Sequence, residues 1–350
     1  MTKIVYLLII VFICGCATND KVWYRGNTHT HTELCGHADS HPDKVAKWYL
    51  DQGYNFLILS EHNIFIDPNI VKLPENRRQD FILVPGQEVT GHKHIHTTAM
   101  NIKERVPANY FNNEKEKIVQ HHVDSVIGKG GHAILNHPNF HYALDHHHIG
   151  KVKNLYMFEL FNGHPTVNNH GDKDHESTEQ MWDRLLSAGM LIYGVSSDDA
   201  HHFKKWAEKS SNPGRGWVMV NSNGDLSSSA LTHAMVHGHF YSSSGVFLND
   251  ISKNKNHYSV SVNDQLTKSE INKAFVSGKI VKNAQEGYLI EFIADEGKVL
   301  KSANAMDATF SPPKGISYLR VKVTLTLKLN GEFRQFFAWG QPVFFDDRSH

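Results

Sequence analysis

Short apolar runs, each ended by histidine or an acidic residue, constrain the fold of this chain more than any other feature. Each run is short enough to form one strand. The runs cover residues 22–24, 55–59, 81–84, 94–102, 133–135, 155–158 and 191–195. The polar residues that accompany them are His29, His31, Glu61, His62, Glu88, His96, His137, Glu159, Asp199 and His201. Active sites of parallel barrels lie where the strands end, so we expect these side chains to come together.

Amphipathic segments alternate with the apolar runs. Val45, Trp48 and Tyr49 are spaced three and four residues apart in part of the segment 43–51, which predicts a helix with one buried face. The same spacing predicts helices over 114–129 and 177–188. Strands that alternate with helices are typical of parallel βα units. The expected class is therefore α/β, and seven runs that place polar residues at the same end favour a barrel over an open sheet.

The pattern changes after about residue 250. From 319 to 329 every odd position is apolar and every even position is polar, as in a half-buried antiparallel strand. Tyr258, Val260 and Val262 repeat this alternation over a shorter length. We expect residues 250–350 to form a small all-β sandwich-like domain that packs on a barrel domain over residues 22–249. The absence of a long low-complexity linker favours a fixed interface between them.

The first residues are typical of an export signal. The apolar segment 4–14 is too short to span ~30 Å of hydrocarbon and suits the apolar region of a secretory signal. Residues 13–16, with the sequence ICGC, resemble a bacterial lipobox, so we expect 1–15 to be a lipoprotein signal peptide. Cys16 would then be the lipidated membrane anchor, and Ala17 favours the outer membrane as its place in the cell envelope. The alternatives are an ordinary signal peptide and an uncleaved anchor.

Composition points to metal binding and argues against two other classes. Of the 26 histidines, 21 lie between His29 and His202, and histidine is the commonest metal ligand. The 36 basic residues balance the 36 acidic ones, which argues against a basic platform for nucleic acid. The 40% hydrophobic content argues against an acidic disordered chain.

The order and spacing of the polar clusters resemble the PHP (polymerase and histidinol phosphatase) superfamily of metal-dependent phosphoesterases. The resemblance covers about residues 22–250. It rests on His29-x-His31, His37, Glu61-His62, Glu88, His96, Asn136-His137-Pro138 and Asp199-Ala200-His201. The segments 86–90, 159–163 and 194–203 are similar to an exported branch of that family, and this similarity extends into the β domain.

The resemblance implies a distorted (β/α)7 barrel with two or three divalent metals at the carboxyl face of its strands. The implied first site comprises His29, His31, Glu88 and Asp199; Glu88 bridges to a second metal held also by His96 and His137; and a third is held by His37, His62 and His201. His92 or His94 could replace His96. The family often has Asp at the position of Glu61, which is not normally a ligand. Imidazoles with two carboxylates favour zinc, manganese or iron over magnesium.

The implied activity is hydrolysis of a small-molecule phosphate ester by a metal-bound hydroxide. Glu88, Asp199 and His201 would belong to the catalytic centre. A leaving alkoxide needs a metal or an acid, and the candidates at the mouth of the site are His164, His202, His141 and Arg215. Arg215 could bind a phosphate with two hydrogen bonds, or form a structural ion pair.

Other polar residues near these motifs receive structural interpretations. We expect Asp198 to orient a histidine, and Glu159 either to do the same or to contact substrate. Cys35 is expected to be a partly exposed or buried thiol beside the site. His121 and His122 are expected to be exposed on their helix. The tract 146–148 could bind metal.

Two other functions compete with phosphoester hydrolysis. An amidohydrolase-like barrel also begins with His-x-His, but His37 and Glu88 match the extra ligands of the phosphoesterases, and no clear bridging lysine follows a strand. The second alternative is a non-catalytic, metal- or glycan-binding surface lipoprotein. The complete ligand set argues against this alternative, although metal capture does not prove turnover.

Overall fold

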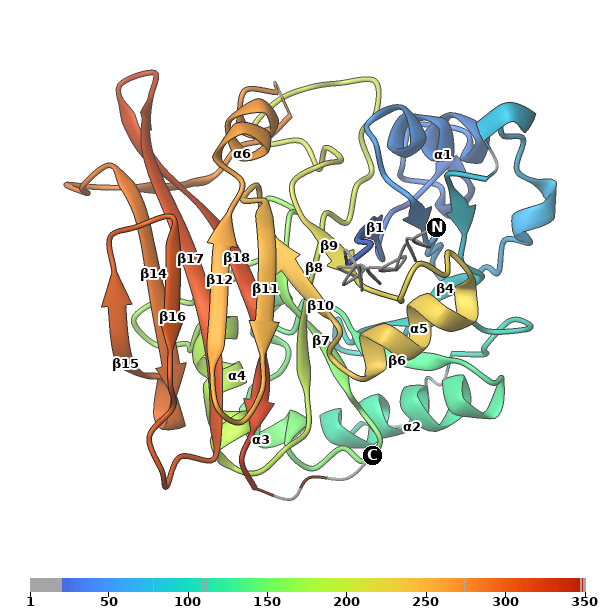
Figure 1. Cartoon of the computed structure of the whole chain (residues 1–350). Helices are drawn as coiled ribbons and strands as arrows, with labels where there is room; N and C mark the ends of the chain where they lie inside the picture. The colour runs from blue at the N-terminus through green and yellow to red at the C-terminus, as the bar shows by residue number, and fades with distance from the viewer. Residues whose placement is uncertain are drawn as a thin grey trace, which may run out of the picture.

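The computed structural model describes residues 21–77, 79–108, 110, 113–273, 275–346 and 348. Over these residues the chain is a mixed α/β protein in which strands outnumber helices (Figure 1). The helices are α1 (Pro42–Asp51), α2 (Lys115–Gly128), α3 (His146–Ile149), α4 (Thr178–Ser187), α5 (Ser228–Val236) and α6 (Asp264–Ile271). None of the helices in this part of the chain is long and apolar enough to cross a membrane. The expected signal peptide 1–15 and the lipidated Cys16 lie outside the described residues.

The strands fall into an N-terminal and a C-terminal group. The first group is β1 (Tyr24–Asn27), β2 (Phe56–Leu57), β3 (Ile82–Leu83), β4 (Gly86–Thr90), β5 (His96–Met100), β6 (His132–Leu135), β7 (Met157–Asn162) and β8 (Tyr193–Ser197). The second is β9 (Trp217–Val220), β10 (Phe240–Ser243), β11 (Leu248–Lys253), β12 (Tyr258–Val262), β13 (Lys279–Val281), β14 (Gly287–Ala294), β15 (Lys298–Ala303), β16 (Asp307–Phe310), β17 (Tyr318–Leu329) and β18 (Glu332–Phe344).

The three helices expected from apolar spacing are confirmed as α1, α2 and α4. Local sequence explains where two of them begin. Pro42 occupies the first turn of α1, where its missing N–H costs no hydrogen bond. At α4, the Ser177 hydroxyl accepts the Gln180 amide N–H while the Gln180 side chain accepts the Ser177 N–H. This reciprocal capping satisfies two donors that a helix start leaves unpaired.

Hydrogen-bonded strands form three sheets among the described residues. The largest has the order β15-β14-β17-β18-β10-β9-β1-β2-β3, with β13 paired to β18. A second has the order β4-β5-β6-β7-β8, and a third the order β11-β12-β16. Parallel pairing is confined to β1-β2-β3 and β6-β7-β8. The expected βα units are therefore present, but they are divided between two sheets.

The α/β class is confirmed, whereas the closed (β/α)7 barrel is not. No sheet of the described residues closes on itself, and β5 runs antiparallel to both β4 and β6. Two single bridges nevertheless join the first two sheets where their strands end. Thr30 pairs in parallel with Ala200, and His62 pairs in parallel with Glu88. These bridges bring the polar ends of β1, β2, β4 and β8 to the same place.

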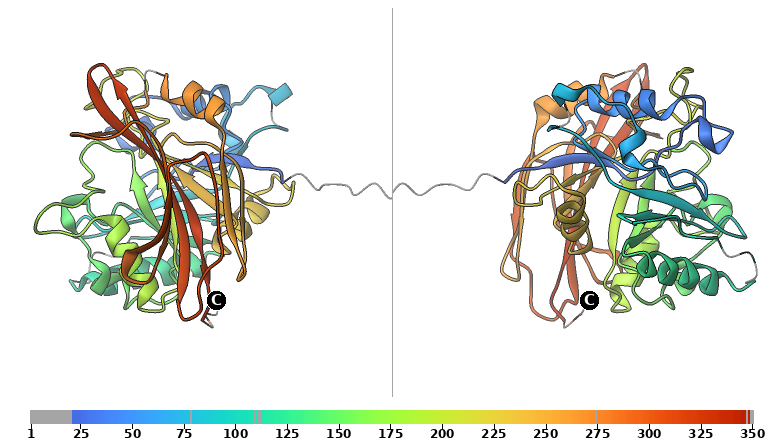
Figure 2. Two further views of the ribbon diagram at one scale, coloured as in Figure 1. Left: turned by 60° about the vertical axis from the view of Figure 1, so that its left-hand side comes forward. Right: turned by 90° about the vertical axis from the view of Figure 1, so that its right-hand side faces the viewer.

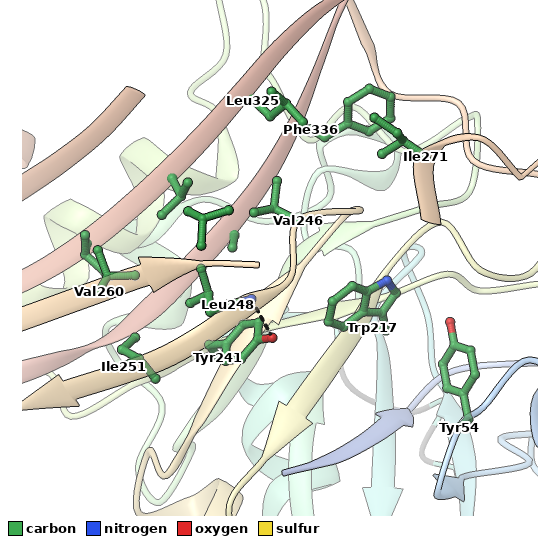
Figure 3. Packing of buried hydrophobic residues seen from close by; sticks show 14 of the residues in the cluster. Tyr54, Trp217, Tyr241, Val246, Leu248, Ile251, Val260, Ile271, Leu325 and Phe336 are labelled. Atoms are coloured by element: carbon green, nitrogen blue, oxygen red, sulfur yellow. Dashed lines mark hydrogen bonds between the residues drawn. The ribbon is translucent and has the colours of Figure 1, made fainter. Parts of the chain in front are cut away.

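The C-terminal strands form two packed layers. Figure 3 shows side chains of β11 and β12, such as Ile251 and Val260, facing those of β17 and β18, such as Leu325 and Phe336. The burial of each large aliphatic side chain contributes roughly 2 kcal/mol to the free energy of unfolding. The layer that contains β18 continues through β10 and β9 into β1. Figure 2 shows these orange and red strands lying against the green and blue part of the chain.

The alternating segment 319–329 forms β17, as expected, but its polar side is also largely covered. Arg320 is 1% exposed, and its guanidinium binds Asp183 of α4 through two hydrogen bonds of 2.7 and 2.6 Å. Thr324 and Thr326 are buried as well. Alternation alone predicts that one face of the strand is exposed to solvent. In β17 much of that face is instead covered by α4 and by the buried ion pair between Arg320 and Asp183.

Candidate metal centre

The centre of the site lies where β1, β4 and β8 meet. His29 and His31 follow β1 on alternate residues, so both imidazoles lie on one side of the strand. Nε2 of His29 lies 3.2 Å from Glu88 Oε1 and 3.3 Å from Asp199 Oδ1. Nε2 of His31 lies 3.3 Å from the same Asp199 oxygen and 3.1 Å from Nε2 of His29. Two imidazoles and two carboxylates therefore converge on one point.

Glu88 connects this group to a second set of imidazoles. Its Oε1 lies 3.2 Å from His96 Nδ1 and 3.4 Å from His137 Nε2. Oε2 lies 2.6 Å from His62 Nδ1. Because β5 is antiparallel to β4, its first residue, His96, faces Thr90 near the end of β4 and so reaches the same edge. Glu88 thus contacts histidines from both sides, as a carboxylate shared by two metals would.

The structure distinguishes His96 from the two alternatives near it. His96 lies against Glu88, whereas Nε2 of His92 contacts the carbonyl of Tyr110. The ring of His94 stacks on His141 with centroids 4.4 Å apart. Neither His92 nor His94 reaches the carboxylate.

A third group lies at the mouth of the site. Nε2 of His201 is 3.0 Å from Nε2 of His37, and the ring of His62 stacks on His37 with centroids 5.1 Å apart. His31, His62 and His201 place one ligand atom each within 4.8 Å of one another, as do Cys35, His37 and His201. All nine residues expected to bind metal are therefore brought together, and the Cys35 thiol lies beside them with intermediate exposure.

Buried polar side chains hold the cluster from behind. Glu159 Oε1 lies 2.8 Å from His29 Nδ1, and its Oε2 accepts the His137 backbone N–H at 2.7 Å. Asn162 donates to Glu159 at 2.8 Å and to Asp199 at 3.2 Å. Asn136 donates to Glu88 at 2.8 Å. Neither asparagine was predicted to have a role. Asn136 directly follows the apolar run 133–135, and Asn162 is the last residue of β7.

Neighbouring imidazoles lower the pKa values of the Glu88, Glu159 and Asp199 carboxyls. Burial opposes the charge on Glu88, but His96, His62 and His29 hold its pKa well below the usual value. Burial likewise opposes charge on His29, yet Asp199, Glu159 and Glu88 raise its pKa well above the usual value. Burial, reinforced by His31, lowers the pKa of His201 to about 2. A neutral imidazole such as His201 offers a lone pair to a metal.

Comparison with known protein families and with curated proteins finds no match for this chain.

The donor set fits divalent metals. Imidazole nitrogens of two pairs, His29–His31 and His37–His201, face each other near 3 Å, and the fully buried carboxylate of Glu88 lies among the imidazoles. Buried anions require a cation, and these ligand types suit zinc, manganese and iron. The buried His/Glu/Asp groups could therefore hold a metal ion.

Two of these residues also have strained backbones. His137 has φ 24° and Asp199 has φ 50°, which are uncommon values for residues with a side chain. Such strain costs on the order of 1–3 kcal/mol and persists where the surroundings fix it, often at functional sites. Thr30–Ala200 pairing and the His137 hydrogen bond to Glu159 provide that fixation.

The cluster opens into a cavity of about 340 Å³. His164 and His202, two of the candidates for contact with the leaving group, line it together with Ser211, Phe140 and Val167. The Thr166 backbone N–H donates to His164 Nδ1 at 3.3 Å. Since a backbone N–H can only donate, Nδ1 is an acceptor and the neutral ring carries its proton on Nε2.

The other two leaving-group candidates lie elsewhere. The guanidinium of Arg215 donates to the carbonyl oxygens of Ala207, Glu208 and Phe275 and to Asn212 Oδ1, and the side chain does not line the cavity. These contacts give Arg215 a structural position, though with carbonyls rather than the ion pair considered above. His141 stacks on His94 and does not line the cavity either.

Two expectations about individual residues are wrong. Asp198 does not orient a histidine; it accepts hydrogen bonds from Asn27, Tyr49 and the Gly214 amide, between 2.7 and 2.8 Å. It thus ties the end of β1 to the loop that follows β8. His122 is not exposed: its side chain is fully buried beside Thr97, with Nδ1 3.1 Å from the hydroxyl.

Proposed function

We propose that the protein is an exported, metal-dependent phosphoesterase of the PHP superfamily, built on a distorted (β/α)7 barrel. The single observation that carries this proposal is the position of Glu88. Its Oε1 lies 3.2 Å from both His29 and His96, which belong to the sets proposed for two different metals, and its Oε2 lies 2.6 Å from His62 of the third set. A carboxylate shared in this way suits two metals close together, which is the arrangement used for in-line displacement at phosphorus.

The chain's own residues divide the work of such a site. His29, His31, Glu88 and Asp199 would hold the first metal; Glu88, His96 and His137 the second; and His37, His62 and His201 the third. When bound, divalent metals supply acidification of water and neutralisation of charge on phosphoryl oxygens. Phosphoryl transfer needs mainly positioning and charge stabilisation, so few further side chains are required.

His164 is the residue we propose for contact with the leaving-group oxygen. Its ring stands nearly perpendicular to that of His201, with centroids 5.6 Å apart, on the wall of the cavity. Nδ1 is engaged by Thr166, so the N–H at Nε2 is available to donate. His202, whose Nδ1 lies 2.9 Å from Ser211 Oγ, is held by that hydroxyl.

The barrel and the location are part of the same proposal. The two single bridges, Thr30–Ala200 and His62–Glu88, support the barrel because they link the two sheets at the ends of their strands. The apolar segment 4–14 and the lipobox-like ICGC sequence support export and lipidation at Cys16.

Elemental analysis and a substrate screen test the proposal together. The purified protein should contain two or three transition metals per chain and hydrolyse aryl phosphates or phosphodiesters, with activity lost on chelation and restored by metal. Alanine at His31, Glu88 or Asp199 should abolish turnover while leaving the circular dichroism spectrum unchanged. Amides serve as substrate controls: hydrolysis of amides but not of phosphate esters would favour the amidohydrolase-like alternative. Full phosphoesterase activity in all three variants would reject the proposed site.

A further inference from the structure

A second cavity, here called the junction pocket, adjoins the metal cluster. It has a volume of about 310 Å³ and lies between the loop after β7 and the strands β13 and β18. His164 and Val167 line both this pocket and the cavity of the metal cluster. The opposite wall comes from the C-terminal region, through Lys279, Gln335 and Phe337. These two side chains form the boundary between the cavities, so a ligand that occupied both would have to pass them.

Apolar side chains form part of the wall of the junction pocket, beside polar ones such as Asn169 and Ser277. Val167 and Phe337 contribute buried apolar surface, and Ile280 is 48% exposed beside them. Phe337 is fixed in place by stacking on Trp339, with ring centroids 5.3 Å apart. A pocket of this kind gains affinity from an apolar chain or ring and takes its specificity from the few polar groups in it.

Two basic side chains line the junction pocket: Arg215, which backbone carbonyls engage, and Lys279, which is attracted by Glu179 from a distance. Glu208 lines the pocket but pairs with Arg334 at 3.1 Å, and nearby Glu179 pairs with Lys322 at 2.6 Å. Lys279 makes no salt bridge within the described part of the chain. Burial, together with the like charge of Lys322, lowers the pKa of Lys279. An anionic group on a ligand would relieve both effects.

We infer that the junction pocket binds the non-reacting part of the substrate, and that this part is an apolar arm ending in an anionic group recognised by Lys279. The inference rests on the proposed phosphoesterase function and narrows it to phosphate esters of extended, acid-bearing alcohols. It also gives the C-terminal strands a role, because Lys279 and Phe337 select the substrate while the histidine cluster reacts with it.

The test compares two aryl phosphates that differ only in a para substituent: an alkyl arm ending in carboxylate and a neutral alkyl arm of the same length. The wild-type protein should prefer the carboxylate ester by about tenfold in kcat/KM, which corresponds to ~1.4 kcal/mol. Lys279→Met should remove this preference by lowering kcat/KM for the carboxylate ester to that of the neutral ester. Lys279→Glu should reverse the preference.

Lys282→Met is the matched control, because Lys282 is exposed, lies three positions along the chain and does not line the pocket. This variant should keep the tenfold preference. Calorimetric titration with the corresponding phosphonates, which cannot be hydrolysed, measures binding apart from turnover. Tenfold tighter binding of the acidic phosphonate, lost in Lys279→Met but without turnover of any phosphate, would retain the pocket and reject the phosphoesterase. Equal affinity for the two phosphonates, or binding of neither, would overturn the pocket.

Discussion

Glu159 Oε1 lies 2.8 Å from Nδ1 of His29, on the side of the ring that faces away from Glu88 and Asp199. The imidazole is therefore held between one carboxylate behind it and two in front. A carboxylate at the far nitrogen of a metal-binding imidazole fixes its tautomer and orientation and makes the other nitrogen a better ligand. Glu159 thus acts on the proposed centre without facing its cavity.

Glu159→Gln should weaken metal binding by about 10–100-fold while the chain stays folded, because the amide is neutral and holds His29 less firmly. Competition against a chromogenic chelator measures the affinity. Glu176→Gln is the control: Glu176 also pairs with an imidazole, His146 at 2.9 Å, but lies outside the cavity. Metal affinity within twofold of the wild type in Glu159→Gln would contradict this role.

Removing His164 should affect substrates according to their leaving groups. Since we propose that the Nε2–H of its neutral ring donates a hydrogen bond to the leaving oxygen, His164→Ala should lower kcat for an alkyl phosphate by ~10²–10³-fold. An activated nitrophenyl ester, whose leaving oxygen carries less charge, should lose little. Steady-state kinetics on both esters makes the comparison, with the surface variant His175→Ala as control. Equal losses for the two esters would argue for a role in substrate binding instead.

Metal binding should stabilise the folded chain through the buried carboxylates. At a free zinc concentration about 100-fold above Kd, the free energy of unfolding should rise by about 2.7 kcal/mol. Glu88→Gln should reduce this gain strongly because it removes the shared ligand. Glu104→Gln, at a surface pair with Lys129, should leave it unchanged. Thermal unfolding at increasing zinc concentration gives the measurement, and an undiminished gain in Glu88→Gln would count against the centre.

The buried Arg320–Asp183 pair should be costly to break on one side only. Arg320→Met leaves Asp183 buried and unpaired, which should lower the free energy of unfolding by about 3–5 kcal/mol. The double variant Arg320→Met, Asp183→Leu should recover part of that loss, because the carboxylate that would lack its partner is removed as well. Urea unfolding monitored by fluorescence tests both. If the double variant is no more stable than the single one, the ion pair is not the cause.

Acid should destabilise the protein partly through His122. Burial, reinforced by His121 and His96, lowers the pKa of His122 to about 3 from the ordinary value of 6.5. Between these values the unfolded chain binds a proton that the folded chain does not, so stability falls as pH falls through that window. From pH 6.5 to 4.5 the loss should be roughly 2 kcal/mol.

His122→Met keeps the side-chain volume and removes the titrating group. The difference in unfolding free energy between the metal-free wild type and this variant should therefore shrink or reverse as the pH falls to 4.5. If the stability of the wild type and that of His122→Met change with pH in parallel, the pKa of His122 is the same in the folded and the unfolded chain.

The sequence predicted single helices and strands well. It predicted less well how these elements are arranged relative to one another. The spacing of Val45, Trp48 and Tyr49 predicted α1, and the ends of apolar runs predicted which side chains cluster. Nothing in the sequence of β5 indicates that it runs antiparallel, because alternation carries no direction. The carbonyls that engage Arg215 come from loops up to sixty residues away, so its structural position had no local signal.

The burial of His122 follows from the spacing of the apolar residues in α2. Val119, His122, Val123 and Val126 all lie on the same face of α2 and are buried. His122 lies three residues after Val119 and four residues before Val126. This spacing puts its side chain on the buried face of the helix, whatever its own polarity. His121 and His122 were expected to share one environment because they are adjacent in sequence. Adjacent residues of a helix point about 100° apart, so the two side chains lie on different faces.

The continuous sheet from β1 through β9 and β10 to β18 determines how the polypeptide can reach its native state. Strand β1 pairs with β9, Tyr24 opposite Val220, and β10 pairs with β18, Tyr241 opposite Gly340, so pairing in this sheet closes long loops. Such high contact order slows folding, since chain entropy is lost before the distant contacts form. A nascent chain that stops before β18 would leave the backbone groups of β10 and β17 exposed along open edges, where other unfinished copies can pair with them and aggregate.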